Sequence, residues 1–124
     1  MQNSQYYKNK YGIPVNDFEE IKKRDTNCVY CHKKMLFSWD PNNIRNCATF
    51  EHLNHKKNWV SIRDYVNKGK PVCEITAICC WDCNTNRKDQ SLRDWFKKDY
   101  CKEKNINYSA VAKVVKNYID KYEK

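Results

Sequence analysis

Two Cys-x-x-Cys pairs constrain the fold of this chain more than any other feature. The first pair is Cys28 and Cys31, and the second is Cys80 and Cys83. Each pair forms a tight turn that presents two sulfurs to one metal ion, and four thiolates suit tetrahedral zinc. We therefore expect one closed, structural zinc site that joins two distant segments. Cys79 is an alternative ligand to Cys80, although the two-residue spacer favours Cys80.

A second interpretation of the first pair is a haem attachment site. Cys28, Cys31 and His32 form a Cys-x-x-Cys-His motif, which attaches c-type haem. That chemistry requires export, and no apolar run follows Met1 to serve as a signal peptide. It would also leave the second cysteine pair without a role. Zinc in a reducing compartment is therefore the favoured interpretation.

Charge and length indicate the class of partner. The chain has 124 residues, which fits a single domain, and a formal net charge of +9. Zinc bound by four thiolates would lower this to about +7. A basic chain of this kind favours a polyanion, most often nucleic acid, over a merely solvated basic surface. No stretch approaches about 18 apolar residues, so we expect no membrane span and a cytoplasmic location.

Hydrophobic periodicity predicts an α+β fold with a β-β-α order at its centre. An arm over residues 1–13 precedes a core over about 18–100. The predicted elements, in chain order, are a helix over 15–24, a strand over 47–53, a strand over 74–79, a helix over about 84–100 and a last helix over about 109–123 capped by Ser109. The last helix could pack on its own chain or form the surface of a homodimer.

Three side chains between and after the cysteine pairs suggest chemistry. Glu51 offers a hard oxygen ligand for an ion such as Mg²⁺ or Mn²⁺, and Asn84 offers a second. A neutral His52 can take a proton from water near pH 7. Adjacent residues on an ideal strand point to opposite faces, so Glu51 and His52 converge only if the strand ends, bends or bulges there. Asn86 is an alternative to Asn84.

In these motifs the chain resembles the HNH endonucleases, also called ββα-metal or His-Me finger nucleases. The resemblance spans about residues 18–97 and consists of three parts: Cys28-x-x-Cys31, Glu51-His52, and Cys80-x-x-Cys83-Asn84 followed by Arg87-Lys88. It implies a small zinc-stapled finger made of a two-stranded hairpin plus a helix, with flanking N- and C-terminal helices. Glu51 stands where aspartate is commoner, and the asparagine that usually opens the second strand is absent.

The resemblance also implies an activity. His52 would activate water, and Glu51 with Asn84 would hold one divalent ion, Mg²⁺ or Mn²⁺, during hydrolysis of DNA that leaves a 5′-phosphate and a 3′-hydroxyl. Arg87 and Lys88 would contact the DNA backbone. Further contacts are expected from the basic loop after His52, at His55, Lys56 and Lys57. The alternative is a zinc-stabilised nucleic-acid-binding protein without catalysis, in which Glu51 and His52 have no chemical role.

Overall fold

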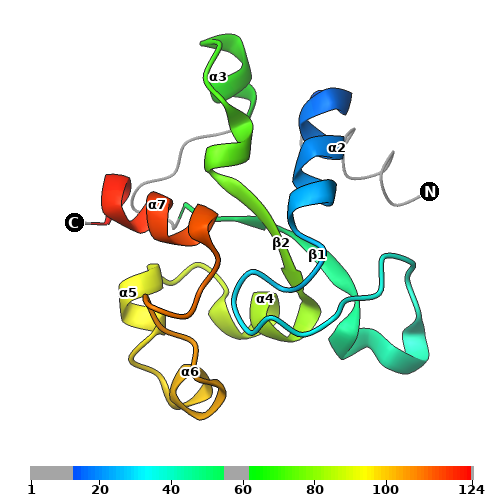
Figure 1. Ribbon diagram of the computed structural model, residues 1–124, viewed down its shortest axis with the longest axis vertical. Coiled ribbons are helices and arrows are strands. Elements are labelled where there is room, and N and C mark those ends of the chain that lie inside the picture. The colour runs from blue at the N-terminus through cyan, green and yellow to red at the C-terminus, as the bar shows by residue number, and fades with distance from the viewer. Residues whose placement is uncertain (1–12, 55–61, 124) are drawn as a thin grey trace.

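The computed structural model describes residues 13–54 and 62–123, and a two-stranded antiparallel sheet lies at its centre (Figure 1). Strand β1 (Ala48–His52) pairs with β2 (Thr76–Cys80), so that Thr49 lies opposite Cys79 and His52 opposite Thr76. β2 begins later than predicted because Glu74 belongs to the short 3₁₀ helix η3 (Val72–Glu74). The mixture of helices with a small antiparallel sheet confirms the α+β class.

Helix α2 (Val15–Arg24) has the predicted bounds and packs beside the sheet. It buries Phe18 and Ile21, and the Phe18 ring stacks on Phe50 of β1 with ring centroids 5.6 Å apart. At its end, the Arg24 guanidinium donates to the Cys73 and Thr76 carbonyls, while buried Asp25 accepts from the Ile78 amide. These bonds fix the end of α2 against β2.

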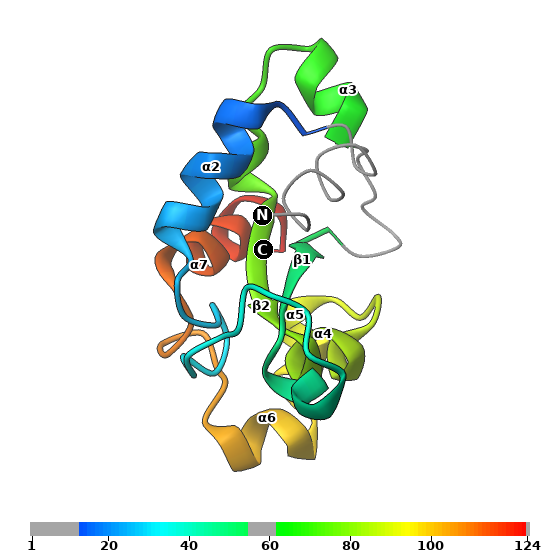
Figure 2. The same cartoon turned by 90° about the vertical axis from the view of Figure 1, so that its right-hand side faces the viewer.

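Two more elements flank the strands. The 3₁₀ helix η1 (Pro41–Asn46) leads into β1 and follows the turn predicted at Asp40, whose side chain accepts from the Asn42 amide. Helix α3 (Ile62–Asn67) precedes η3. Figures 1 and 2 both show α3 at one end of the long axis of the molecule and helix α6 at the other.

The prediction of one helix over 84–100 is wrong, because the chain forms three short helices there. They are α4 (Trp81–Arg87), α5 (Leu92–Trp95) and α6 (Asp99–Lys104). Lys88 ends α4 with φ 55° and ψ −125°, a conformation that no helix continues. Ser91 then starts α5 by accepting a hydrogen bond from the Asp94 amide, and Lys98 is extended before α6.

The C-terminal helix α7 (Lys113–Tyr122) begins later than the predicted Ser109 cap, since Ala112 is the residue at its start. Its apolar face, formed by Val115, Tyr118 and Ile119, is buried in the core of its own chain. The following Glu123 carboxylate accepts hydrogen bonds from the first backbone amides of α5. The apolar face of α7 is therefore used within the chain and is not an open dimer surface.

None of the helices within residues 13–54 and 62–123 combines the length and the apolar character that crossing a membrane requires.

Lys88 gives a test of this chain path. A side chain at positive φ is strained, and glycine removes that strain. We expect Lys88→Gly to raise the free energy of unfolding by about 1 kcal/mol, measured by urea denaturation. The matched control is Lys102→Gly within α6, which should lower it by about 1 kcal/mol, because glycine is a poor helix former. A loss of stability in Lys88→Gly would contradict the break after α4.

Candidate functional site

Cys28, Cys31, Cys80 and Cys83 come together as the two spacings predict. Their sulfur atoms all lie within 4.8 Å of one another, and the Cys31 and Cys80 sulfurs are 3.9 Å apart. A tetrahedron with zinc–sulfur bonds of about 2.3 Å has edges of about 3.8 Å. Among the residues that the structure describes, no other group of three or more histidine, cysteine or acidic side chains is arranged to hold a metal ion. The four cysteines form a metal-binding arrangement whose geometry suits zinc.

Local backbone structure places these sulfurs. The Tyr30 amide donates to the Cys28 sulfur and the Cys83 amide to the Cys80 sulfur, each at 3.4 Å. Hydrogen bonding among the four thiols lowers the pKa of Cys31 and lowers that of Cys80 to about 7, and it raises the pKa of Cys28 and of Cys83. Thiolates are the metal-binding form of cysteine. In both turns, backbone amides therefore hold the cysteine sulfurs in position.

The choice between Cys79 and Cys80 is settled by the sheet. Cys80 ends β2 and lies in the cluster, whereas Cys79 points to the face of the sheet that carries Thr49, with the Thr49 hydroxyl 3.7 Å from its sulfur. Cys79 is fully buried, and burial raises the pKa of its thiol well above the usual value. Cys79 is therefore an interior side chain rather than a ligand.

Glu51 lies in the protein interior, with only 4% of its surface exposed. Its Oε2 atom accepts a hydrogen bond of 2.7 Å from the Tyr30 hydroxyl and lies 3.1 Å from Nη1 of Arg87. None of the described residues forms a hydrogen bond with Oε1. Burial raises the pKa of the Glu51 carboxyl, and the neighbouring Arg87 cation opposes that rise. The carboxylate is thus held through one oxygen atom.

Arg87 is the other half of this ion pair, and the prediction that it contacts DNA is wrong. The side chain is fully buried, and its Nη1 and Nη2 atoms donate to the carbonyls of His52 at 3.0 Å and Leu53 at 2.6 Å. Its Nε atom donates to the Gln90 carbonyl at 2.9 Å. A buried cation requires such partners, because removing it from water is costly. Arg87 supports the end of β1 from within.

Asn84 lies in the first turn of α4, directly after Cys83, and faces β1. Its Nδ2 atom donates to the Thr49 hydroxyl at 2.9 Å and to the Phe50 carbonyl at 3.3 Å. Both bonds use the nitrogen, which leaves Oδ1 as an acceptor. The alternative residue, Asn86, is turned toward α5, where its Oδ1 accepts from the Trp95 indole at 2.8 Å. Asn84 therefore faces β1, the strand that carries Glu51, whereas Asn86 faces α5.

His52 occupies the last position of β1, and the strand stays regular there. His52 pairs with Thr76, and the next amide, from Leu53, donates to the Ile75 carbonyl at 2.9 Å. Glu51 and His52 consequently leave the strand on opposite faces, so the structure does not bring the two side chains together. Burial and the Arg87 cation lower the pKa of the imidazole to about 4. His52 is thus neutral near pH 7.

The remaining predicted contacts lie at the surface or outside the described chain. Lys88 is exposed at the end of α4, as a backbone contact requires. His55, Lys56 and Lys57 fall outside the described residues, as do residues 1–12 of the predicted arm over 1–13.

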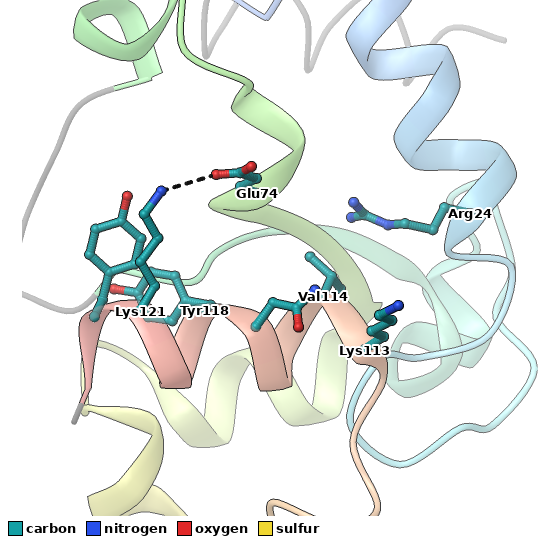
Figure 3. Close-up of a pocket in the computed structure, with 8 residues that line it drawn as sticks. Arg24, Glu74, Lys113, Val114, Tyr118 and Lys121 are labelled. Atoms are coloured by element: carbon teal, nitrogen blue, oxygen red, sulfur yellow. Dashed lines mark hydrogen bonds and ion pairs between the residues drawn. The ribbon is translucent and has the colours of Figure 1, made fainter.

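A separate hollow of about 310 Å³ lies between α7 and η3 (Figure 3). Arg24, Lys113 and Lys121 bring positive charge to it, but Lys121 pairs with Glu74 at 3.4 Å. The Arg24 guanidinium is already bonded to backbone carbonyls. Its lining includes none of Glu51, His52 and Asn84. This hollow is therefore not part of the candidate site.

The structure adds Tyr30 to the predicted site residues and places Arg87 in the interior instead of at the surface. Arg87 comes three residues after Asn84 and four after Cys83, so all three share the helix face that packs on the sheet. That spacing was an available signal for burial. For Tyr30 the pattern offered no comparable signal, because its hydroxyl bonds to Glu51 across 21 residues of sequence.

Replacing neighbouring cysteines tests the metal site. We expect Cys80→Ser to lose the bound zinc and to lower the thermal midpoint, because metal binding is coupled to folding. Cys79→Ser is the matched control, and it should keep one zinc per chain. Zinc content by atomic absorption and a melting curve check both variants. Full zinc in Cys80→Ser, or its loss only in Cys79→Ser, would contradict the assignment.

Comparisons with protein-family models, curated proteins and solved structures find no match to this chain. Its resemblance to the HNH endonucleases therefore rests on the cysteine pairs, the Glu51-His52 dipeptide and Asn84 themselves.

Proposed function

We propose that this protein is a metal-dependent endonuclease that hydrolyses phosphodiester bonds in DNA. The observation that carries the proposal is the position of Asn84. Its amide is bonded to Thr49 and Phe50, the two residues that precede Glu51. Thr49 and Glu51 share one face of β1, so α4 and β1 bring an amide and a carboxylate to the same side of the sheet.

The donor atoms fit a hard divalent cation. Glu51 has Oε1 and Asn84 has Oδ1 beyond the bonds that fix each side chain. Mg²⁺ and Mn²⁺ prefer oxygen ligands, and Mg²⁺ commonly uses one or two carboxylates together with water and substrate phosphate. A bound ion would stabilise the negative charge that develops on the phosphate and on the leaving oxygen. A catalytic ion of this kind would be distinct from structural zinc at the cysteines.

His52 is the proposed general base. Its imidazole is neutral near pH 7, since burial and Arg87 lower its pKa to about 4. A neutral ring has a nitrogen able to accept a proton from water, and a phosphate anion beside it would raise its affinity for that proton. Because His52 and Glu51 leave β1 on opposite faces, the substrate phosphate would have to lie across the end of the sheet.

The charge of the chain supports a polyanionic substrate. The sequence carries a formal charge of +9, and Lys88 is exposed one residue beyond the helix that holds Asn84. Such a lysine can contact phosphate without reading base sequence. Arg87, in contrast, belongs to the interior and supports the strand that carries Glu51 and His52.

A second function is favoured by one observation. The Glu51 carboxylate is buried and already paired with Arg87. A buried ion pair can be a purely structural device. In that case the chain is a zinc-stabilised nucleic-acid-binding protein in which Glu51 and His52 have no chemical role.

Cleavage assays separate the two functions. The purified protein is incubated with Mg²⁺ or Mn²⁺ and a panel of supercoiled, single-stranded and branched DNA. We expect metal-dependent cleavage that falls about 100-fold or more in His52→Ala, the scale of a lost general base. Zinc content and DNA affinity should stay at the parental level.

The matched control for these assays is Glu20→Gln, which changes an exposed carboxylate on α2 and should cleave like the parent. DNA binding without cleavage on any substrate or metal would contradict the endonuclease and support the second function. If His52→Ala cleaves DNA at the rate of the parent protein, His52 is not the general base.

A further inference from the structure

Tyr30 links the first cysteine turn to Glu51. It lies between Cys28 and Cys31, is fully buried, and its hydroxyl donates to Oε2 of Glu51 at 2.7 Å. Its ring packs edge-on against Trp95 with ring centroids 4.9 Å apart. This ring contact limits the movement of the Tyr30 hydroxyl, and a metal ion bound by Cys28 and Cys31 would limit it further.

Arg87 is the second residue that bonds to the Glu51 carboxylate. Its Nη1 atom lies 3.1 Å from Oε2 of Glu51 and 3.3 Å from the Tyr30 hydroxyl oxygen. Further bonds from the guanidinium to the carbonyls of His52 and Leu53 fix Arg87 itself. Tyr30 and Arg87 both bond to Oε2 of Glu51, and these two bonds fix the orientation of the carboxylate. Oε1 keeps its capacity to bind a cation.

The second cysteine turn places the other ligand. Asn84 follows Cys83 directly, and its amide is fixed by Thr49 and Phe50. Each cysteine pair therefore contributes to one of the two proposed oxygen ligands: the first pair through the Tyr30 hydroxyl on Glu51, and the second through the backbone neighbour Asn84.

We propose that Tyr30 and Arg87 are positioning residues that hold Glu51 through Oε2 and present Oε1 to the divalent cation, so that the cysteine cluster organises the second metal site. This inference rests on the proposed function, because it assigns Glu51 and Asn84 to a catalytic ion. Hydrogen-bond partners that orient a metal ligand typically change metal affinity by about 10- to 100-fold when removed. A purely structural ion pair would have no such effect.

The test measures Mn²⁺ binding to the zinc-loaded protein by electron paramagnetic resonance, without DNA and without turnover. Tyr30→Phe removes the hydroxyl and keeps the ring that packs on Trp95. We expect its Mn²⁺ dissociation constant to rise about 10-fold or more, while the zinc content stays at one per chain. Cleavage by this variant should fall at low Mn²⁺ and recover at high Mn²⁺, because the defect lies in ion binding.

Two further variants show whether a change in Mn²⁺ binding comes from this site or from a general effect on the fold. Arg87→Lys keeps a buried cation but cannot bond Glu51, His52 and Leu53 at once, and we expect the same weakening of Mn²⁺ binding. The matched control is Tyr108→Phe, which removes another tyrosine hydroxyl from a carboxylate, Asp120, at 2.8 Å on the surface. That variant should bind Mn²⁺ like the parent.

The results distinguish the positioning role of Tyr30 and Arg87 from the proposed endonuclease activity. Parental Mn²⁺ affinity in zinc-loaded Tyr30→Phe and Arg87→Lys would overturn the positioning role and leave the endonuclease intact. A parent protein that binds no Mn²⁺, or whose binding survives Asn84→Ala unchanged, would overturn the second metal site itself and the inference with it.

Discussion

The buried guanidinium of Arg87 forms hydrogen bonds with several segments of the candidate site. It joins the end of α4 to the end of β1 through Glu51, His52 and Leu53, and it meets the Tyr30 hydroxyl from the first cysteine turn. A cation taken out of water is tolerated only where several acceptors surround it, and breaking one buried partner typically costs about 3–5 kcal/mol. Helix, strand and cysteine turn are therefore fixed relative to one another, which is the condition for any chemistry at Glu51 and Asn84.

A metal ion bound by the cysteine cluster would join two distant segments of a small core. The sheet has only two strands, and several of the helices around it are one or two turns long. A sheet and helices of this size each bury little apolar surface, so a bound metal ion would add substantially to the stability of the fold. The cysteine turns also lie next to side chains of the proposed site: Tyr30 lies within the first turn, and Asn84 directly follows the second. The same cysteine turns would therefore contribute both to the stability of the fold and to the positions of Tyr30 and Asn84.

The sequence was most informative where spacing alone decides the structure. Cys-x-x-Cys turns, the amphipathic helix over 15–24 and the two strands follow from local patterns, and the structure has them. The long helix over 84–100 was wrong because Leu92 and Trp95 keep helical spacing even though Lys88 and Lys98 interrupt the backbone. Arg87 was misplaced because a charged residue after a metal turn suggests a surface, whereas its interior environment depends on Glu51 and Tyr30 from other segments. The opposite faces taken by Glu51 and His52 depend on the regular pairing of β1 with β2, which local patterns do not determine.

Anomalous diffraction can test whether two different metal sites share this one scaffold. Crystals grown with Zn²⁺ and Mn²⁺ would be measured at the absorption edges of both elements. We expect a zinc peak among the sulfurs of Cys28, Cys31, Cys80 and Cys83, and a separate manganese peak at the oxygens of Glu51 and Asn84. Zinc alone, with Glu51 still held by Arg87 and no manganese beside Asn84, would contradict this expectation.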